Sequence, residues 1–250
     1  MEGTNPPLEG AHVTATDDLI DRLPEPPEAL APATSQAERV ADMLRVFVID
    51  GALAPGTRLS EERLSRKYGV SRNTLREAFR LLSRERLLVH QMHRGVFVNR
   101  PTSEDVRDLF SARRTLEIPA VRGARDACDR AVAAVGSAVA EGQAARAQAD
   151  WWAMGTANMH FHRALAGLAG SARINEFMSQ VLAETRLVFH VMNAPEQFHA
   201  PYLDWNRRIH QRLTERDADT AAVELSRYLD TSEEQLVTAF TAMERRADGR

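Results

Sequence analysis

Residues 70–82 read VSRNTLREAFRLL, and this stretch decides how the rest of the chain is interpreted. On a helix, its apolar side chains recur with helical spacing and form one buried stripe, made of Leu75, Ala78, Phe79 and Leu82. Ser71 can accept hydrogen bonds from the free amides of the first turn, so we expect the helix to start there. Arg72, Asn73 and Arg76 are then exposed near its start. Such a helix can reach base edges and phosphates in a major groove, and we predict a DNA recognition helix.

The flanking sequence decides between DNA recognition and the plainer alternative, a charged helix face that is only solvated. Ser60 is a suitable N-cap for a preceding short helix, which Gly69 closes. Two short helices joined by so brief a turn are typical of a helix-turn-helix. After the second helix, the β-prone residues 87–91 and 96–99 flank residues 92–95. This pattern predicts a β-hairpin, which beside a helix-turn-helix would be a wing.

Length and composition indicate an ordinary soluble protein with room for two domains. The chain has 250 residues, of which 44% are hydrophobic and 27% are charged. The net charge of −3 is unevenly distributed, because residues 1–34 carry −6, residues 35–101 carry +6 and residues 102–250 carry −3. Positive charge is therefore concentrated in the segment that holds the predicted recognition helix, as binding to a polyanion requires.

The same three segments are the predicted domains. Residues 1–34, with six prolines and seven acidic residues, are predicted to be a disordered tail that solubilises the protein, and weak interaction with the basic segment is the alternative. The predicted fold class is mainly α, with a winged helix-turn-helix over residues 35–101 and an all-α bundle of six to seven helices over residues 102–250. No stretch has the pattern of a signal peptide or membrane span, so we expect a cytoplasmic, nucleoid-associated protein with no membrane partner. Cys128 is the single cysteine, and we expect it to be buried as a small apolar residue.

Three motifs in the basic segment resemble the DNA-binding domain of GntR-type bacterial regulators. They are residues 54–65 (APGTRLSEERLS), residues 68–78 (YGVSRNTLREA) and residues 94–98 (RGVFV). The resemblance extends over residues 38–100 and implies a winged helix-turn-helix that binds double-stranded operator DNA. It also implies which residues contact the DNA. In the helices these are Arg63, Arg72, Asn73, Thr74 and Arg76, and at the tip of the wing they are His93, Arg94 and Gly95.

From residue 103 onward the hydrophobic spacing is helical throughout. It predicts six helices, over residues 103–124, 125–147, 149–169, 171–193, 200–217 and 218–245. The apolar stripe of the first helix includes one arginine, Arg113. Because an unpaired buried guanidinium is costly, Arg113 is expected either to pair internally or to point into a polar cavity.

This helical segment resembles the FCD effector domain of the FadR branch, through residues 113–117 (RRTLE), 161–166 (FHRALA) and 217–222 (DADTAA). Many FCD domains hold a divalent metal on one aspartate and three histidines, and carboxylate effectors bind beside it. The corresponding positions here are Asn158, His162, Asn206 and Tyr228, so the resemblance implies a site in which only the histidine at 162 is retained. Two amides and a phenol are poor ligands for a transition metal, and we therefore expect no metal and no other cofactor.

Three interpretations of this polar set are open. Other histidines could rebuild a metal site, namely His160, His190, His199 and His210. Alternatively, the polar set is a hydrogen-bonded core that binds nothing. The preferred interpretation is a metal-free pocket for a small carboxylate or another polar metabolite. Its expected lining residues are Arg113, Asn158, His162, Asn206 and Tyr228.

Together these features predict a ligand-responsive transcriptional regulator that binds a two-fold operator as a homodimer, and we expect a repressor. Effector binding in the helical domain would alter the placement of the two winged helices and hence the affinity for DNA. The alternative is a DNA-binding dimer whose helical domain is only structural. An enzyme is not expected, because the sequence has no paired-carboxylate motif, glycine-rich phosphate loop or nucleophile elbow.

Overall fold

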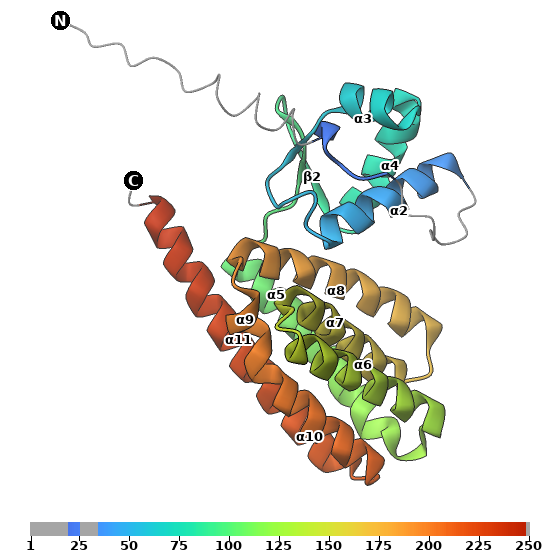
Figure 1. The fold of residues 1–250 in the computed structure, drawn as a ribbon, viewed down its shortest axis with the longest axis vertical. Helices are drawn as coiled ribbons and strands as arrows, with labels where there is room; N and C mark the ends of the chain where they lie inside the picture. Colours follow the sequence, from blue (N-terminus) through green and yellow to red (C-terminus); the bar gives the residue numbers. More distant parts are fainter. Residues whose placement is uncertain (1–19, 26–34, 249–250) are drawn as a thin grey trace, which may run out of the picture. The chain divides into compact units, whose positions relative to one another are not determined.

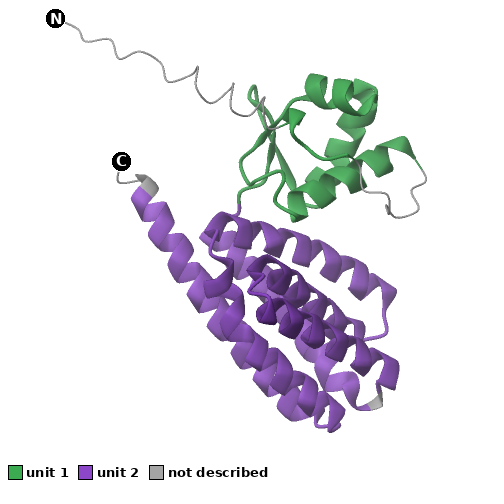
Figure 2. Cartoon of the chain, in the orientation of Figure 1, with its two compact units in different colours: residues 1–100 green, residues 101–250 purple. Residues whose placement is uncertain are grey.

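The computed structural model describes residues 20–25 and 35–248, and the chain divides into two compact units between Arg100 and Pro101 (Figure 2). The sequence analysis placed this boundary one residue later. Within the described ranges, no helix combines the length and the apolar character needed to cross a bilayer.

Unit 1 contains the helix-turn-helix. Its helices are α2 (Gln36–Ile49), α3 (Glu61–Tyr68) and α4 (Arg72–Arg84) (Figure 1). Helix α2 begins at a capping box, in which the Ser35 hydroxyl accepts from the Glu38 amide while the Glu38 carboxylate accepts from the Ser35 amide. Helix α2 packs against α4, and their buried faces supply much of the core of this unit. The stripe predicted for α4 is buried as expected, with Leu75, Ala78 and Leu82 fully enclosed and Phe79 4% exposed.

The wing is part of a three-stranded antiparallel sheet with the order β1-β3-β2. The strands are β1 (Arg58–Leu59), β2 (Leu88–Gln91) and β3 (Gly95–Val98). Strands β2 and β3 form the predicted hairpin. Strand β1 was not predicted from the sequence, but Arg58 pairs with Phe97, and Leu59 pairs with Val96 and is buried. Two residues are too short to show a strand pattern on their own; the partner strand supplies the hydrogen bonds.

The prediction of a disordered tail over residues 1–34 is wrong for residues 20–25. This segment packs on α3, with Ile20 fully buried and Leu23 only 5% exposed. The acidic, proline-rich composition of residues 1–34 gave no sign of this ordered segment, because its anchoring contacts come from only two apolar side chains, three residues apart. The rest of the predicted tail lies outside the described residues.

Unit 2 is an all-α bundle, as predicted. Its long helices are α5 (Ser103–Arg122), α6 (Asp129–Ala147), α7 (Trp151–Gly167), α8 (Ala172–Met192), α10 (Leu203–Thr214) and α11 (Ala218–Asp248). Three short helical turns join them: η1 (Gly123–Asp126), α9 (Pro195–His199) and η2 (Ala200–Tyr202). Helices α5 and α11 lie side by side, as do α6 and α7 (Figure 1).

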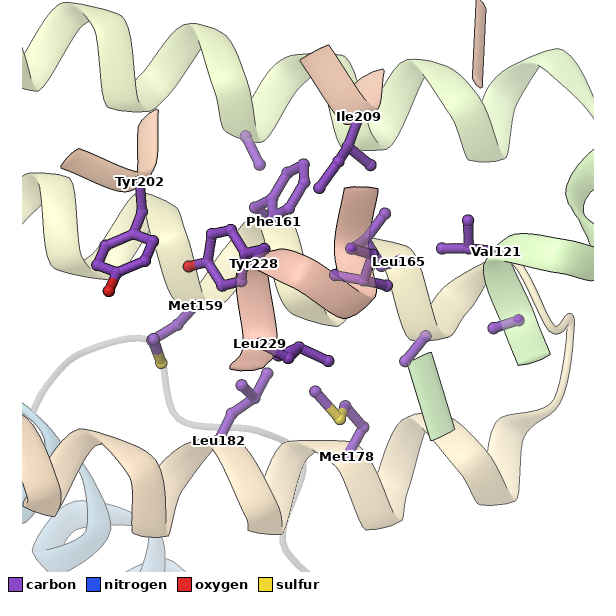
Figure 3. Close-up of a cluster of buried hydrophobic side chains, with 14 of the residues drawn as sticks. Val121, Met159, Phe161, Leu165, Met178, Leu182, Tyr202, Ile209, Tyr228 and Leu229 are labelled. Carbon is purple, nitrogen blue, oxygen red and sulfur yellow. The ribbon is translucent and has the colours of Figure 1, made fainter. Parts of the chain in front are cut away.

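The core of unit 2 is formed by apolar side chains from several of these helices. Figure 3 shows Phe161 and Leu165 of α7 close to Tyr228 and Leu229 of α11, with Leu182 of α8 on the other side of Leu229. All five residues are at most 2% exposed. This close-packed surround holds the polar side chains at the centre of the bundle in fixed positions.

Two details of unit 2 differ from the sequence prediction. The prediction left residues 194–199 without structure, whereas Pro195 starts the short helix α9. Cys128 was expected to be buried and is exposed. The reason is that Cys128 is the N-cap residue of α6, outside the helical stripe whose spacing suggested burial.

Candidate functional site

Helix α4 presents the side chains predicted to contact DNA. The Ser71 hydroxyl accepts from the Thr74 amide at 3.1 Å and fixes the start of the helix, as predicted. Arg72, Asn73 and Arg76 are exposed on the side opposite the buried stripe. Thr74 is half-buried, and its hydroxyl lies 2.9 Å from that of Ser71, so it is held within the cap.

The turn before α4 sets the angle at which this helix leaves α3. Ser60 caps α3 by accepting from the Arg63 amide, and Gly69 ends it with a left-handed φ of 63°. This conformation suits glycine, because it has no Cβ to clash with the backbone. Only Val70 and Ser71 then separate the two helices. The geometry is that of a helix-turn-helix, in which the second helix enters a major groove.

The arginines predicted to contact DNA differ in whether they form an ion pair within the protein. Arg76 Nε donates to Glu61 Oε2 of α3 at 3.0 Å, and Arg66 pairs with Glu62 along α3. Arg72 forms no ion pair with any residue in the described part of the chain. Its guanidinium is therefore presented to solvent at the start of α4, where a bidentate contact to guanine is geometrically simple.

The wing brings His93, Arg94 and Gly95 together at its tip, as the sequence predicted. His93 has a left-handed φ of 62°, and Gly95 has a φ of 107°, a value that only glycine adopts readily. Arg94 lies over the ring of Phe97, with its guanidinium carbon 5.7 Å from the ring centroid. Met92 beside them is 80% exposed. The tip is narrow and lacks a bulky side chain at residue 95, so it can approach a DNA backbone closely.

Two neighbouring open grooves lie beside these residues and share His90 and Val96 of the sheet as lining residues. One, of about 670 Å³, is bordered by α3 and the sheet and includes Arg58, Arg63 and Arg66. The other, of about 430 Å³, is bordered by α4 and the sheet and includes Arg76, Arg80 and Arg84. The first groove has arginine on both walls and the second has it on the α4 wall, and exposed arginine suits the binding of phosphates.

In unit 2, the five residues predicted to form an effector pocket lie in one buried hydrogen-bonded network. Arg113 Nε donates to Glu117 Oε1 at 2.9 Å, and both side chains are at most 1% exposed. Glu117 Oε2 lies 2.6 Å from His162 Nδ1, and His162 Nε2 lies 3.0 Å from the Tyr228 hydroxyl. The sequence analysis expected Arg113 to pair internally or to face a polar cavity, and the internal pair is formed. Glu117, on the next turn of α5, was not identified as its partner.

The network continues through two amides. Asn158 Nδ2 donates to the Tyr228 hydroxyl at 3.1 Å, and Asn206 Nδ2 donates to Asn158 Oδ1 at 2.8 Å. The Tyr228 hydroxyl also lies 3.2 Å from Asn158 Oδ1, to which it can donate if it accepts from His162 instead. In the other assignment, Tyr228 donates to His162 Nε2, and His162 donates from Nδ1 to the Glu117 carboxylate. This requires a neutral imidazole. Burial and the charge of Arg113 agree with it, because both lower the pKa of His162.

Comparisons with known proteins identify both units. Residues 36–98 match the family described as bacterial regulatory proteins, gntR family, and residues 108–231 match the FCD domain. A solved GntR transcriptional regulator from Rhodococcus sp. RHA1 is 42% identical to this chain, with a TM-score of 0.78; the match covers 83% of this chain and 100% of that one. The chain belongs to the GntR family.

More distant relatives agree with this assignment. A helix-turn-helix regulator of Paraburkholderia xenovorans, BphR, is 38% identical over 96 residues, which are 38% of this chain and 39% of that protein. The repressor RspR of Escherichia coli is 33% identical over 95 residues, which are 38% of this chain and 42% of that protein. This GntR-family chain thus aligns with about two fifths of the length of these curated relatives. Escherichia coli McbR/YncC shares the fold, with a TM-score of 0.69, 20% identity and coverage of 82% of this chain and 99% of that one. The matched domains are those of DNA-binding transcriptional regulators and not of enzymes.

The residues of this GntR-family protein do not fit the metal site that the FCD resemblance implies. Asn158, His162, Asn206 and Tyr228 do come together, but the free nitrogen of His162 is occupied by the Tyr228 hydroxyl. Burial raises the pKa of Tyr228, which opposes the ionisation that metal binding would need. Elsewhere in the part of the chain that the structure describes, no cluster of three or more histidine, cysteine, aspartate or glutamate side chains could hold a metal ion.

A small polar cavity adjoins the two amides. It has a volume of about 10 Å³, and Asn158, Asn206 and His199 lie in its wall. Both ring nitrogens of His199 and the Oδ1 atom of Asn206 are buried without a hydrogen-bond partner in the structure. Burial, together with the charges of Arg186 and His190, lowers the pKa of His199 to about 3, so this ring is neutral. Unsatisfied buried polar atoms around a cavity indicate a position for a polar guest.

His199 was named at the sequence level only as one of four histidines that could rebuild a metal site. The other three do not line this cavity: His160 pairs with Glu141, His190 stacks on Trp152, and His210 lies against Gly136. No residue spacing could have indicated His199, because it reaches the cavity from the short helix α9, which has no amphipathic pattern of its own.

Arg58 is a further groove residue that the sequence analysis missed. Its Nε atom lies 3.5 Å from the position that a Cβ on Gly95 would occupy, so it borders both the wing and the groove beside α3. We expect Arg58→Ala to weaken binding to a mixed-sequence duplex and to reduce the slope of log affinity against log salt by about 1, the loss of one phosphate contact. Fluorescence anisotropy over a series of salt concentrations measures this. Arg39→Ala removes an exposed charge near the start of α2 and serves as the control. An unchanged slope for Arg58→Ala would show that this side chain is not a phosphate contact.

Proposed function

We propose that this chain is a transcriptional repressor that binds a two-fold operator as a homodimer and changes its DNA affinity when a small polar metabolite binds in unit 2. DNA-binding regulation is the common function of the GntR relatives, whereas the dimer, the operator and the effector are our proposals. The observation that carries the DNA-binding part is the exposed start of α4, where Arg72 and Asn73 stand above a fully buried stripe.

The homodimer is supported by the small size of the surface of α4 that can contact DNA bases. Helix α4 has 13 residues, and only the exposed side chains of its first turns can reach base edges. One such module buries too little surface to bind its operator much more tightly than random DNA. Two modules held at a fixed spacing bury more surface and contact two half-sites. Any change in unit 2 that alters this spacing then alters operator affinity without touching the contacts themselves.

The effector part is supported by the unsatisfied polar atoms in unit 2. Arg113 Nη2, the His199 ring nitrogens and Asn206 Oδ1 are all buried without partners in the structure. The charge of Arg113 is balanced by Glu117, so a carboxylate effector would have to compete with an existing ion pair. We therefore favour a polar effector that offers hydrogen-bond donors to Asn206 and either a donor or an acceptor to neutral His199.

The cavity must enlarge to admit such a molecule. Its 10 Å³ hold about one water, whereas sites for small molecules usually have volumes of about 300–1,000 Å³. Helix α9 is the wall best suited to move, because it is five residues long and follows Asn193, which ends α8 in a left-handed conformation. In this proposal, effector binding displaces α9 and passes the change to the helices packed against it.

The experiment is a thermal-shift screen of uncharged and anionic polar metabolites, followed by DNA binding with any compound that stabilises the protein. An effector at about 100 times its dissociation constant should add about 2.7 kcal/mol to the stability of the state that binds it. The matched control is Asn206→Leu, which removes the unsatisfied amide and should abolish the shift. A stabilising compound that leaves operator affinity unchanged contradicts the regulatory role. If no compound stabilises the protein, unit 2 is a structural domain. Elemental analysis that found stoichiometric transition metal would contradict the metal-free cavity.

A further inference from the structure

Residues 20–25, which we call the N-terminal strap, bind to the helix that precedes the recognition helix. Asp21 Oδ2 lies 3.2 Å from Arg63 Nη1, and Lys67 Nζ donates to the Asp21 carbonyl oxygen at 2.7 Å. The Tyr68 hydroxyl donates to the carbonyl oxygen of Pro24 at 3.2 Å. Three residues of α3, which lie within two turns, are thus engaged by Asp21 and Pro24 of the strap.

Two apolar side chains anchor the strap. Ile20 is fully buried and Leu23 is 5% exposed, whereas Asp21, Arg22, Pro24 and Glu25 are exposed. The backbone turns between the anchors, because the Leu23 amide donates to the Ile20 carbonyl oxygen at 3.3 Å. Burial of two such side chains gives the strap a defined position, so its contacts with α3 are not chance encounters of a charged tail.

The α3 groups held by the strap are cations that DNA would also use. The GntR resemblance implies that Arg63 contacts DNA, and Arg63 lines the groove between α3 and the sheet. The strap belongs to a segment of charge −6, and α3 belongs to a segment of charge +6. A carboxylate on Arg63 and a carbonyl oxygen on Lys67 occupy the positions that phosphate oxygens would take.

We infer that the N-terminal strap competes with DNA for α3, so that the free protein covers part of its own DNA-binding surface and DNA must displace the strap from Arg63 and Lys67. The inference rests on the proposed DNA-binding function and on the contact between Arg63 and DNA that the GntR resemblance implies. Because any duplex that contacts α3 must displace the strap, the strap lowers the affinity for operator and random sequences by the same factor. At a given protein concentration, fewer random sites are then occupied.

The test compares full-length variants in binding to a mixed-sequence DNA duplex by fluorescence anisotropy at fixed salt. Asp21→Asn removes the ion pair but keeps the carbonyl contact, and we expect about two- to fivefold tighter binding. Replacing both anchors (Ile20→Asn with Leu23→Asn) detaches the strap from Arg63 and Lys67 together, and we expect about tenfold tighter binding. Asp50→Asn is the matched control, since Asp50 is an exposed carboxylate at the end of α2 and its loss changes the net charge equally.

A second measurement is independent of the variants. Hydrogen exchange of the wild-type protein should show faster exchange of the amides of residues 20–25 when the duplex is bound. Equal affinities for Asp21→Asn and Asp50→Asn, or a strap that stays protected in the DNA complex, would overturn the inference and make the strap a permanent brace. If the anchor replacements unfold unit 1, the exchange measurement on the wild type still decides. A failure of the proposed DNA-binding function would look different, because the wild type and every variant would then fail to bind the duplex.

Discussion

Arg72→Ala is expected to lower affinity for the sequence that the wild-type protein selects from a random duplex pool by roughly 5- to 150-fold, the range for one lost bidentate base contact. Affinity for unselected duplex should change little. The reason is the position of Arg72, which is the first residue of α4, is exposed and has no ion pair in the described part of the chain. Its guanidinium is therefore available for a base edge without first leaving a partner.

Arg66→Ala is the control variant for this experiment. Arg66 is 73% exposed on α3 and pairs with Glu62 beside the groove, a position suited to phosphate contact. Its loss should weaken selected and unselected DNA by the same factor. Equal losses for Arg72→Ala on both kinds of DNA would mean that Arg72 also contacts only phosphate, and base recognition would then rest on Asn73 and Arg76.

Glu117→Gln is expected to lower the free energy of unfolding by roughly 3–5 kcal/mol, the cost of leaving a buried charge without its partner. Burial raises the pKa of Glu117, but the neighbouring His162 and Arg113 outweigh burial and hold that pKa below its usual value, so the group is an ionised carboxylate. Removing its charge leaves the buried guanidinium of Arg113 uncompensated. Chemical denaturation monitored by circular dichroism and by tryptophan fluorescence measures the loss in unit 2, which holds all three tryptophans.

A matched control separates burial from hydrogen bonding. Glu141 and His160 form a pair with the same 2.6 Å distance as Glu117 and His162, but their side chains are 53% and 43% exposed. Glu141→Gln should therefore change stability by less than about 1 kcal/mol. Replacing the buried pair by apolar residues, Arg113→Met with Glu117→Leu, should recover part of the loss. If Glu117→Gln proved as mild as Glu141→Gln, the buried ion pair would contribute little to the fold.

The parts of this structure that the sequence predicted are those encoded by local patterns. Ser60 and Ser71 begin α3 and α4 because each can accept from a first-turn amide, and Gly69 ends α3 because it tolerates a positive φ. These effects act over three or four residues and can be recognised without a tertiary structure. The helix over residues 72–84 and the hairpin are confirmed for the same reason.

The parts that were missed depend on partners distant in the sequence. Leu59 becomes a strand residue only because β3 lies beside it, and Ile20 is buried in a segment whose hydrogen-bond partners lie on α3. His199 reaches the polar cavity from a helix too short for a periodic pattern, and Cys128 is exposed because a helix cap interrupts the spacing that suggested burial. The residues predicted to bind the effector do lie together in one buried network, and their role in effector binding stays a prediction.

The buried network of unit 2 has a polarity when Tyr228 donates to His162 and not to Asn158 Oδ1, which lies 3.2 Å from its hydroxyl. The order of donation runs from Asn206 through Asn158, Tyr228 and His162 to Glu117. Asn206 Nδ2 now donates to Asn158 Oδ1. A bound molecule that rotated the Asn206 amide by half a turn would place the Asn206 Oδ1 acceptor opposite Asn158 Oδ1. Every following link would then have to reverse, and the proton of His162 would move from Nδ1 to Nε2, leaving Glu117 facing a lone pair. One amide at the cavity wall is therefore connected by hydrogen bonds to the ion pair of Arg113 on helix α5.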